Sequence, residues 1–206
     1  GSLGEASLLA RNFVLLNGTV AVNLAGSGVL VKDTDSSISG GTVTLLGINS
    51  YSGSTTVKAG RLVLGADNVL SSQAEVRVVE GTLDLGGAFT NTVQSVVLEN
   101  GRLENGRLLA ESFDVRNGSI SAVLGGSGTL IKTTSGTVVL SAQNVYTGET
   151  QIVGGRLVLG GEQVLSESAS LVVNGGTLDL GGAFANRVRT MRLEDGVLEN
   201  GTLRAS

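Results

Sequence analysis

The hexapeptide GRLVLG occupies residues 60–65 and stands again, letter for letter, at residues 155–160. Two other stretches recur at the same spacing: GTLDLGGAF at residues 81–89 and 176–184, and LENG at residues 103–106 and 198–201. All three pairs are 95 residues apart (155 − 60, 176 − 81 and 198 − 103). Self-similarity at a fixed period is typical of repeat architectures. The hexapeptide is therefore one part of a long structural repeat.

The repeat extends beyond these short copies. Residues 8–32 align with residues 108–132 at an offset of 100, which falls to 95 because the loop after Lys32 is longer than its counterpart. These offsets predict one repeat over residues 8–107, a second over 108–202 and the start of a third at 203–206. We expect residues 1–206 to form one continuous array.

The composition limits both the core and the chemistry. The 206 residues include 32 Gly and no Pro, Cys, His or Trp, so the core must consist of thin aliphatic layers. Without His or Cys the chain cannot form a Ser-His-Asp triad or most zinc sites. A net charge of −4 argues against nucleic acid or an anionic membrane surface as a partner. No apolar run approaches the roughly 18 residues that a membrane span needs.

Short alternating segments between glycines predict strands. In GRLVLG, Leu62 and Leu64 would face one side, and Arg61 and Val63 the other. This period of two is that of a half-buried strand. Helical periodicity is weak throughout.

The same alternation in GTLDLGGAF would turn Leu83 and Leu85 inward, and Thr82 and Asp84 outward. The best helical candidates, residues 67–73 and 163–168, are too short to stand alone.

Two all-β architectures fit such segments. Asn-Gly pairs between strands are a strong hairpin signal, which favours an antiparallel meander or sandwich. A β-solenoid, in which each strand pairs in parallel with its equivalent one coil later, explains the fixed period and the narrow residue alphabet better. The lack of Pro also fits, because a central strand cannot lose a backbone donor. The pairs are Asn17-Gly, Asn100-Gly, Asn105-Gly, Asn117-Gly and Asn200-Gly.

We therefore predict an all-β solenoid. With about 20 residues per coil, the chain would form about ten coils, and at ~4.8 Å per coil the rod would be about 50 Å long. Residues 33–40 would form a surface loop on one coil.

Residues 126–160 carry a specific order of motifs. The sequence resembles the passenger-associated transport repeat, also called the autotransporter-associated β-strand repeat. The first repeat carries a version that differs by Ser52 in place of Thr and by the loop after Lys32. The matching residues are Gly126, Ser127, Gly128, Thr129, Leu130, Lys132, Gly136, Thr137, Leu140, Asn144, Tyr146, Thr147, Gly148, Thr150, Gly155, Arg156 and Leu157, and in the first repeat Gly26, Ser27, Gly28, Lys32, Gly41, Thr42, Asn49, Tyr51, Gly53, Thr55, Thr56, Gly60, Arg61 and Leu62.

The resemblance implies more than the residues alone. It implies a segment of an autotransporter passenger of a Gram-negative type V secretion system, folded as a right-handed parallel β-helix. It also implies export across the outer membrane, with the protein displayed on the cell surface or secreted.

Clustered carboxylates are the only residues that suggest catalysis, because some parallel β-helices act on polysaccharides with such groups. The same carboxylates occur in both repeats, whereas an active site usually occurs once. We therefore predict no enzyme activity. The candidates are Asp84 with Asp179, Glu99 with Glu194, and Glu104 with Glu199.

Two segments resemble ligand-binding motifs, a calcium-binding β-roll and a phosphate loop, but neither matches its motif. LDLGGAF has the Asp and Gly of a calcium-binding β-roll in the wrong order. The glycines of residues 26–28 and 126–128 resemble a phosphate loop, but no GK[ST] follows, so corners between strands are favoured. The sequence predicts no cofactor and no metal site.

Arginines and tyrosines are the remaining candidates for a binding surface. One hypothesis is that the arginines form a basic stripe for a ligand; we favour outward positions whose stems cover apolar surface. Tyr51 and Tyr146, each in an N-x-Y-[ST]-G motif, are either exposed contacts or corner plugs, and their equivalent placement favours the plug. The arginines concerned are Arg61, Arg102, Arg107, Arg156, Arg187, Arg189 and Arg192.

Three functions remain open at this point. The first is a non-enzymatic stalk or scaffold of a surface-displayed adhesin. In the second, the repeats themselves bind host extracellular matrix or a cell-surface receptor, or associate with each other, and repetition adds avidity. The third, a carbohydrate-active enzyme, is the least favoured. We expect no nucleic-acid partner and no direct insertion of this segment into the membrane.

Overall fold

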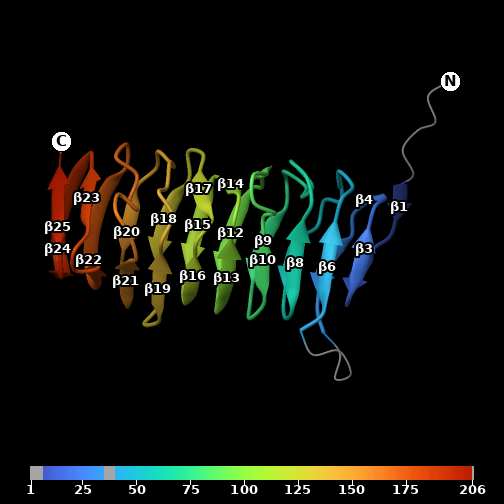
Figure 1. Cartoon of the computed structure of the whole chain (residues 1–206), viewed down its shortest axis with the longest axis horizontal. Helices are drawn as coiled ribbons and strands as arrows, with labels where there is room; N and C mark the ends of the chain where they lie inside the picture. Colours follow the sequence, from blue (N-terminus) through green and yellow to red (C-terminus); the bar gives the residue numbers. More distant parts are fainter. Residues whose placement is uncertain (1–6, 35–39, 206) are drawn as a thin grey trace.

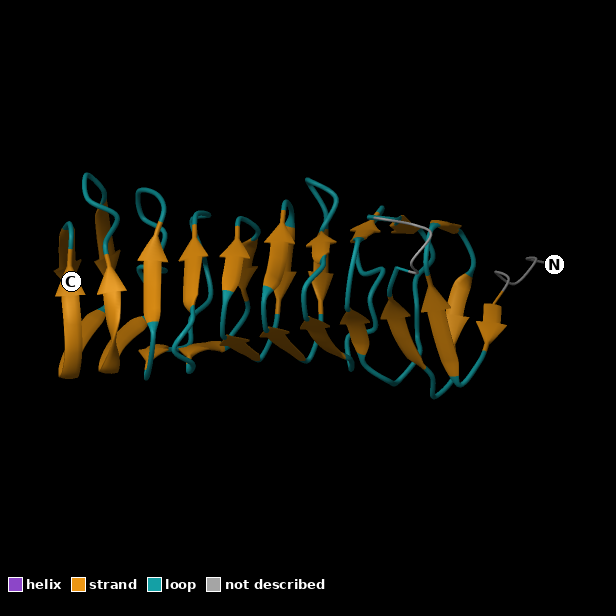
Figure 2. Ribbon diagram, turned by 90° about the horizontal axis from the view of Figure 1, so that it is seen from below, coloured by secondary structure: helices purple, strands orange, loops and turns teal. Residues whose placement is uncertain are grey.

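The computed structural model describes residues 7–34 and 40–205, which form a stack of coils around one long axis (Figure 1). A coil is one turn of the chain, and its strands lie beside those of the coils before and after it (Figure 2). Every strand pair in the described residues is parallel. The prediction of an all-β parallel solenoid is confirmed. The hairpin alternative is wrong, because the Asn-Gly pairs turn the chain at corners and do not reverse a strand onto its neighbour.

Each coil presents up to three strands, which define three faces. Face A contains β2 (Asn12–Leu15), β5 (Val29–Lys32), β7 (Thr55–Val57), β9 (Glu75–Val78), β12 (Ser95–Leu98), β15 (Ser112–Val115), β18 (Thr129–Lys132) and β20 (Thr150–Ile152), followed by the first halves of β22 (Ser170–Asp179) and β24 (Thr190–Glu199).

Face B follows face A around a corner. It contains β3 (Gly18–Val20), β6 (Thr42–Leu45), β8 (Arg61–Leu64), β10 (Thr82–Asp84), β13 (Gly101–Glu104), β16 (Gly118–Ile120), β19 (Thr137–Leu140) and β21 (Arg156–Leu159), followed by the second halves of β22 and β24.

Face C is interrupted. Its strands are β1 (Ser7–Leu9) and β4 (Asn23–Ala25), then β11 (Thr90–Thr92), β14 (Arg107–Leu109) and β17 (Val123–Gly125), and finally β23 (Ala185–Val188) and β25 (Thr202–Ala205). The coils between these groups cross face C in turns, including residues 67–73 and 163–168, where the only weak helical patterns were found.

The predicted alternation is confirmed in GRLVLG. Leu62 and Leu64 are fully buried, while Arg61 and Val63 lie on the outer side. Along the axis, Leu62 lies opposite Leu83, which in turn lies opposite Leu103 on the next coil. Burying one such leucine contributes about 1.5–3 kcal/mol, so the aliphatic column stabilises every coil it crosses.

Coils differ in length although their strands stay in register. Arg107 pairs with Val123 (123 − 107 = 16 residues per coil), and Leu30 pairs with Thr55 (55 − 30 = 25). The longest coil includes the loop after Lys32, of which residues 35–39 lie outside the described part of the chain. The differences in coil length therefore lie in the corners, while the strands of the faces stay paired in register.

The first glycine of each hexapeptide is required by its positive φ and by the backbone of the preceding coil, and it also lies beside a buried lysine; a Cβ at Gly155 would overlap the carbonyl oxygens of Thr134 and Gly136. Lys132 points inward and is fully buried; its Nζ donates to the carbonyl oxygens of Thr134 and, at 3.2 Å, of Gly154. Gly155 has a φ of 66°, and a Cβ there would lie 2.7 Å from the lysine Nζ. In the first repeat, Gly60 stands against Lys32 in the same way.

Buried asparagines replace the missing strands of face C. In the first repeat the backbone N of Leu24 donates to Oδ1 of Asn49, and Nδ2 of Asn49 donates to the carbonyl of Val69, both at 2.7 Å. The backbone N of Val69 then donates to Oδ1 of Asn91 at 2.8 Å. These side chains carry the hydrogen-bond ladder across coils that lack a strand.

The second repeat has the same chain of contacts. The backbone N of Leu124 donates to Oδ1 of Asn144 at 2.8 Å, and Nδ2 of Asn144 donates to Val164 O at 2.9 Å. Val164 N then donates to Oδ1 of Asn186 at 2.7 Å. No described side-chain nitrogen or oxygen is buried without a hydrogen-bond partner.

We predict that Asn144→Ala destabilises the protein by about 1–3 kcal/mol, because it leaves the buried backbone N of Leu124 without its acceptor and removes one of the two hydrogen bonds to Val164 O. Urea unfolding measures the loss, and hydrogen exchange of the Leu124 amide should accelerate. The control is Gln143→Ala, since Gln143 is the exposed neighbour and its loss should stay within about 0.5 kcal/mol of wild type. Equal effects of both substitutions would contradict the role given to Asn144.

Candidate functional site

The predicted carboxylates lie on the outer side of faces A and B and bind arginines, which come from neighbouring coils for all of them except Glu194. On face B of the first repeat, Arg61 Nη2 lies 2.6 Å from Asp84 Oδ2, and Arg61 Nη1 lies 3.0 Å from Glu104 Oε2. The three residues come from three successive coils, β8, β10 and β13. Asp84 faces outward as predicted, but its neighbours cover it, so that its side chain is only 11% exposed.

Asp84 is held in its charged form. Burial alone would raise the pKa of this carboxyl, but hydrogen bonds from Asn105 Nδ2 at 2.7 Å, from Gly86 N at 3.0 Å and from Arg61 outweigh burial and lower the pKa. A general acid needs a pKa near the working pH. Asp84 is therefore suited to holding coils together and unsuited to donating a proton.

The second repeat reproduces this arrangement. Arg156 lies 2.6 Å from both Asp179 and Glu199. The hydrogen bond from Gly181 N, followed by that from Arg156, lowers the pKa of Asp179 against the opposing effect of burial. The arginine of each hexapeptide thus ties its own coil to the next two.

Face A carries a second set of ion pairs, which does not repeat. Glu99 Oε1 contacts Arg77 Nη1 and, at 3.4 Å, Arg116 Nη1. Its counterpart Glu194 pairs instead with Arg192 on its own strand, at 2.6 Å. Arg77 and Arg116 were missed in the sequence, because nothing in their local motifs shows that carboxylates of other coils lie beside them.

The other predicted arginines do not form one stripe. Arg102 lies 3.9 Å from Glu104 on face B, and Arg192 lies on face A. Arg107 lies on face C, as do Arg187 and, at its corner with face A, Arg189. Arg61 and Arg156 lie on the outside, as predicted, and bind carboxylates; that their stems also cover apolar surface stays a prediction.

Both tyrosines are fully buried, so the alternative of an exposed contact is wrong. Tyr146 OH lies 2.6 Å from Thr150 Oγ1, and its ring centroid lies 6.3 Å from that of Phe113 on the preceding coil. Tyr51 repeats these contacts with Thr55 and Phe13. Each tyrosine therefore plugs the corner before face A.

The glycines at residues 26–28 and 126–128 form corners, as predicted. Gly26 and Gly126 have φ angles of 102° and 92°. At Gly28 a Cβ would lie 2.5 Å from the carbonyl oxygen of Ala10 on the preceding coil.

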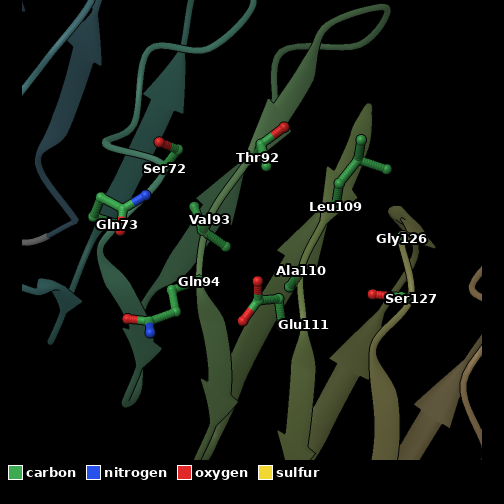
Figure 3. Close-up of a pocket in the computed structure, with 10 residues that line it drawn as sticks. All are labelled: Ser72, Gln73, Thr92, Val93, Gln94, Leu109, Ala110, Glu111, Gly126 and Ser127. Carbon is green, nitrogen blue, oxygen red and sulfur yellow. The ribbon is translucent and has the colours of Figure 1, made fainter.

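One hollow of about 370 Å³ lies where face C meets face A (Figure 3). Its wall is the corner loop with Ser72 and Gln73, and its floor includes Gln94 and Glu111 on the next two coils. The floor is low because those corners have only two residues between strands, Val93-Gln94 and Ala110-Glu111. No motif in the sequence predicts this hollow, because the relative length of the corners becomes apparent only once the strands are in register.

The described residues offer no group of three or more Asp and Glu side chains that could hold a metal ion. Over the same residues, no helix is long and apolar enough to cross a membrane. The arrangement of arginines and carboxylates can cross-link coils by charge and present a mixed polar surface.

Comparison with known proteins bears on the same segments. The family model described as "Passenger-associated-transport-repeat" matches residues 38–64 and 130–159. An adhesin named "Adhesin BmaC autotransporter", from Brucella suis biovar 1 (strain 1330), is 34% identical over 125 residues; these cover 59% of this chain and 3% of the Brucella protein. No solved structure matches significantly. The predicted passenger-associated transport repeats are confirmed.

We predict that acid destabilises the protein partly through Asp84. Because its folded pKa lies below the ordinary value of about 3.9, its contribution is complete above that pH and is lost as the pH falls through the folded pKa. Asp84→Asn should cost about 1–3 kcal/mol at neutral pH and progressively less below pH ~4, measured by urea unfolding across a pH series. Asp195→Asn, at an exposed carboxyl, is the control and should leave the profile unchanged. A cost for Asp84→Asn that does not vary with pH would contradict the assignment.

We predict that both tyrosines ionise only in strong alkali. Burial raises the pKa of Tyr51 and of Tyr146 to about 12, against the opposing hydrogen bonds to Thr55 and Thr150. Their contribution to stability is complete below the unfolded pKa of about 10 and is lost as the pH rises toward 12. The chain has two Tyr and no Trp, so phenolate absorbance reports these residues alone. Ionisation near pH 10 in the folded protein would contradict their burial.

Proposed function

We propose that this chain, a repeat segment of an autotransporter passenger, is a non-catalytic stalk that holds other parts of its parent protein away from the bacterial surface. The observation that carries this proposal is the unbroken ladder of faces A and B, which runs from β2 to β24 over one continuous aliphatic core. A solenoid of this kind grows longer along its axis with each added coil. Its stability is spread over contacts between neighbouring coils.

The use of the charged residues supports the same role. The carboxylates that both repeats share bind arginines, and the shared tyrosines and lysines are buried. The residues that both repeats share therefore join neighbouring coils or fill the core. The similarity to an autotransporter adhesin supports the proposal, and it implies export across the outer membrane to the cell surface or the medium.

We predict that the chain behaves in solution as a rod. Its small-angle scattering should show a constant cross-section over a length of about 50 Å, from ~4.8 Å per coil. A compact, globular scattering profile would contradict the stalk.

A replacement in the parent protein separates support from binding. Exchanging this segment for an unrelated β-solenoid with the same number of coils should leave adhesion of whole cells unchanged. Deleting the segment should reduce adhesion by shortening the reach of the parts it supports. Loss of adhesion on exchange would overturn the proposal in favour of repeats that themselves bind host matrix or cell-surface receptors, or each other.

A further inference from the structure

Three arginines at the C-terminal end of the rod form a group of exposed basic side chains. Half of the basic side chains lie within 4.0 Å of a carboxylate of the described residues. Arg187, Arg189 and Arg204 have no such partner and are exposed. We refer to these three as the arginine patch. It lies on β23 and β25 and at the corner that follows β23 (Figure 1).

The geometry concentrates positive charge. Arg187 lies directly opposite Arg204 in the parallel pair β23–β25, and adjacent strands are about 4.8 Å apart. Like charges placed opposite each other destabilise a sheet. Arg189 lies two residues beyond Arg187, and its Nη2 donates to Ser170 Oγ at 2.8 Å, which leaves its charge without a counterion.

The fold does not require arginine at these positions. The counterparts 95 residues earlier are Thr92, Gln94 and Leu109, and Thr92 pairs with Leu109 in the same register in which Arg187 pairs with Arg204. One scaffold therefore carries neutral side chains at these three positions in the first repeat, where the nearest arginine of β14 is Arg107, and arginines at the equivalent positions 95 residues later. The structural residues of both repeats match, so this departure has a cause outside the fold.

We propose that the arginine patch is a binding site for a linear anionic polysaccharide that carries sulfate or carboxylate groups. A guanidinium donates two parallel hydrogen bonds to such an oxyanion, and the pair Arg187 and Arg204 offers two forks side by side. The site is an open face with no enclosed cavity, which suits an extended polymer. It is a property of the surface and does not depend on the stalk role.

The surroundings favour a narrow polymer over nucleic acid. Glu162 and Glu167 lie on the preceding coil beside the patch; Glu162 Oε2 accepts the backbone N of Ala185, and Glu167 is two residues before Ala169, whose carbonyl accepts Arg189 N. These carboxylates border the arginine patch and keep the positive surface narrow, so that it fits a single extended chain better than the broad phosphate backbone of a duplex. Neither β23 nor β25 carries an aromatic side chain on which a base could stack.

The test is a titration of the 206-residue chain into a fluorescent heparin octasaccharide at about 50 mM salt, where charge-dependent binding is strongest. We expect anisotropy to rise on binding and the affinity to fall as salt increases. Arg187→Gln with Arg204→Gln should weaken binding by at least about tenfold. The matched control is Arg102→Gln with Arg107→Gln, which removes the same charge from exposed positions and should change affinity by less than about twofold.

Moving the arginine pair to the first repeat tests the site without changing the net charge of the chain. Thr92→Arg with Leu109→Arg, added to the double Gln variant, should restore binding at the equivalent place in the first repeat. Thermal unfolding checks that the variants fold; Arg187→Gln with Arg204→Gln should raise the melting temperature, because a like-charge contact is removed. Equal loss in the two double Gln variants, or unchanged binding in the Arg187 and Arg204 variant, would overturn the proposal. Tighter binding of a duplex DNA of equal charge would overturn the assignment to a polysaccharide.

Discussion

The parallel backbone pairing of each coil with the next is the constraint on which the rest of the structure depends. Once Leu62 lies opposite Leu83, every residue of β8 and β10 has a fixed neighbour, and the same holds for each later coil. Side chains on an outer face then stand one strand spacing apart, about 4.8 Å. Arg61 can therefore reach carboxylates 23 and 43 residues away in the sequence, because they are one and two coils away in space.

Aliphatic columns alone would specify this register weakly, because one leucine fits against another in more than one alignment. Buried polar groups do not tolerate such a shift, since a displaced donor or acceptor would be left unpaired. Asn144 must meet Leu124 and Val164 at the same time, and Lys132 must meet carbonyls of two coils. We infer that these residues fix the alignment that the hydrophobic core then stabilises, and that this is why both repeats carry them.

The sequence was enough to predict the fold because period and alternation are properties of the chain itself. The repeat at 95 residues and the inward Leu62 and Leu64 required no knowledge of contacts between coils. The surface was less predictable. The ion-pair partners of Glu99 and the burial of the Asp84 side chain depend on which residues the register brings together. The hollow at Gln94 depends on the lengths of the corners. The three-residue corners at 26–28 and 126–128 were recognisable because their glycines are needed locally.

Differences between the repeats are more informative about recognition than their similarities. Positions that must pair or pack are filled alike in both, as Asn91 and Asn186 show by capping equivalent turns. Positions on the outside of face C are free of that requirement, and there the repeats diverge, with Gln94 beside a polar hollow in one and Arg189 beside Arg187 in the other. A solenoid can thus change the chemistry it presents to a partner coil by coil without changing its backbone. The ladder therefore constrains the inward positions and the shared ion pairs of face B, whereas face C and its corner with face A can carry different side chains in the two repeats.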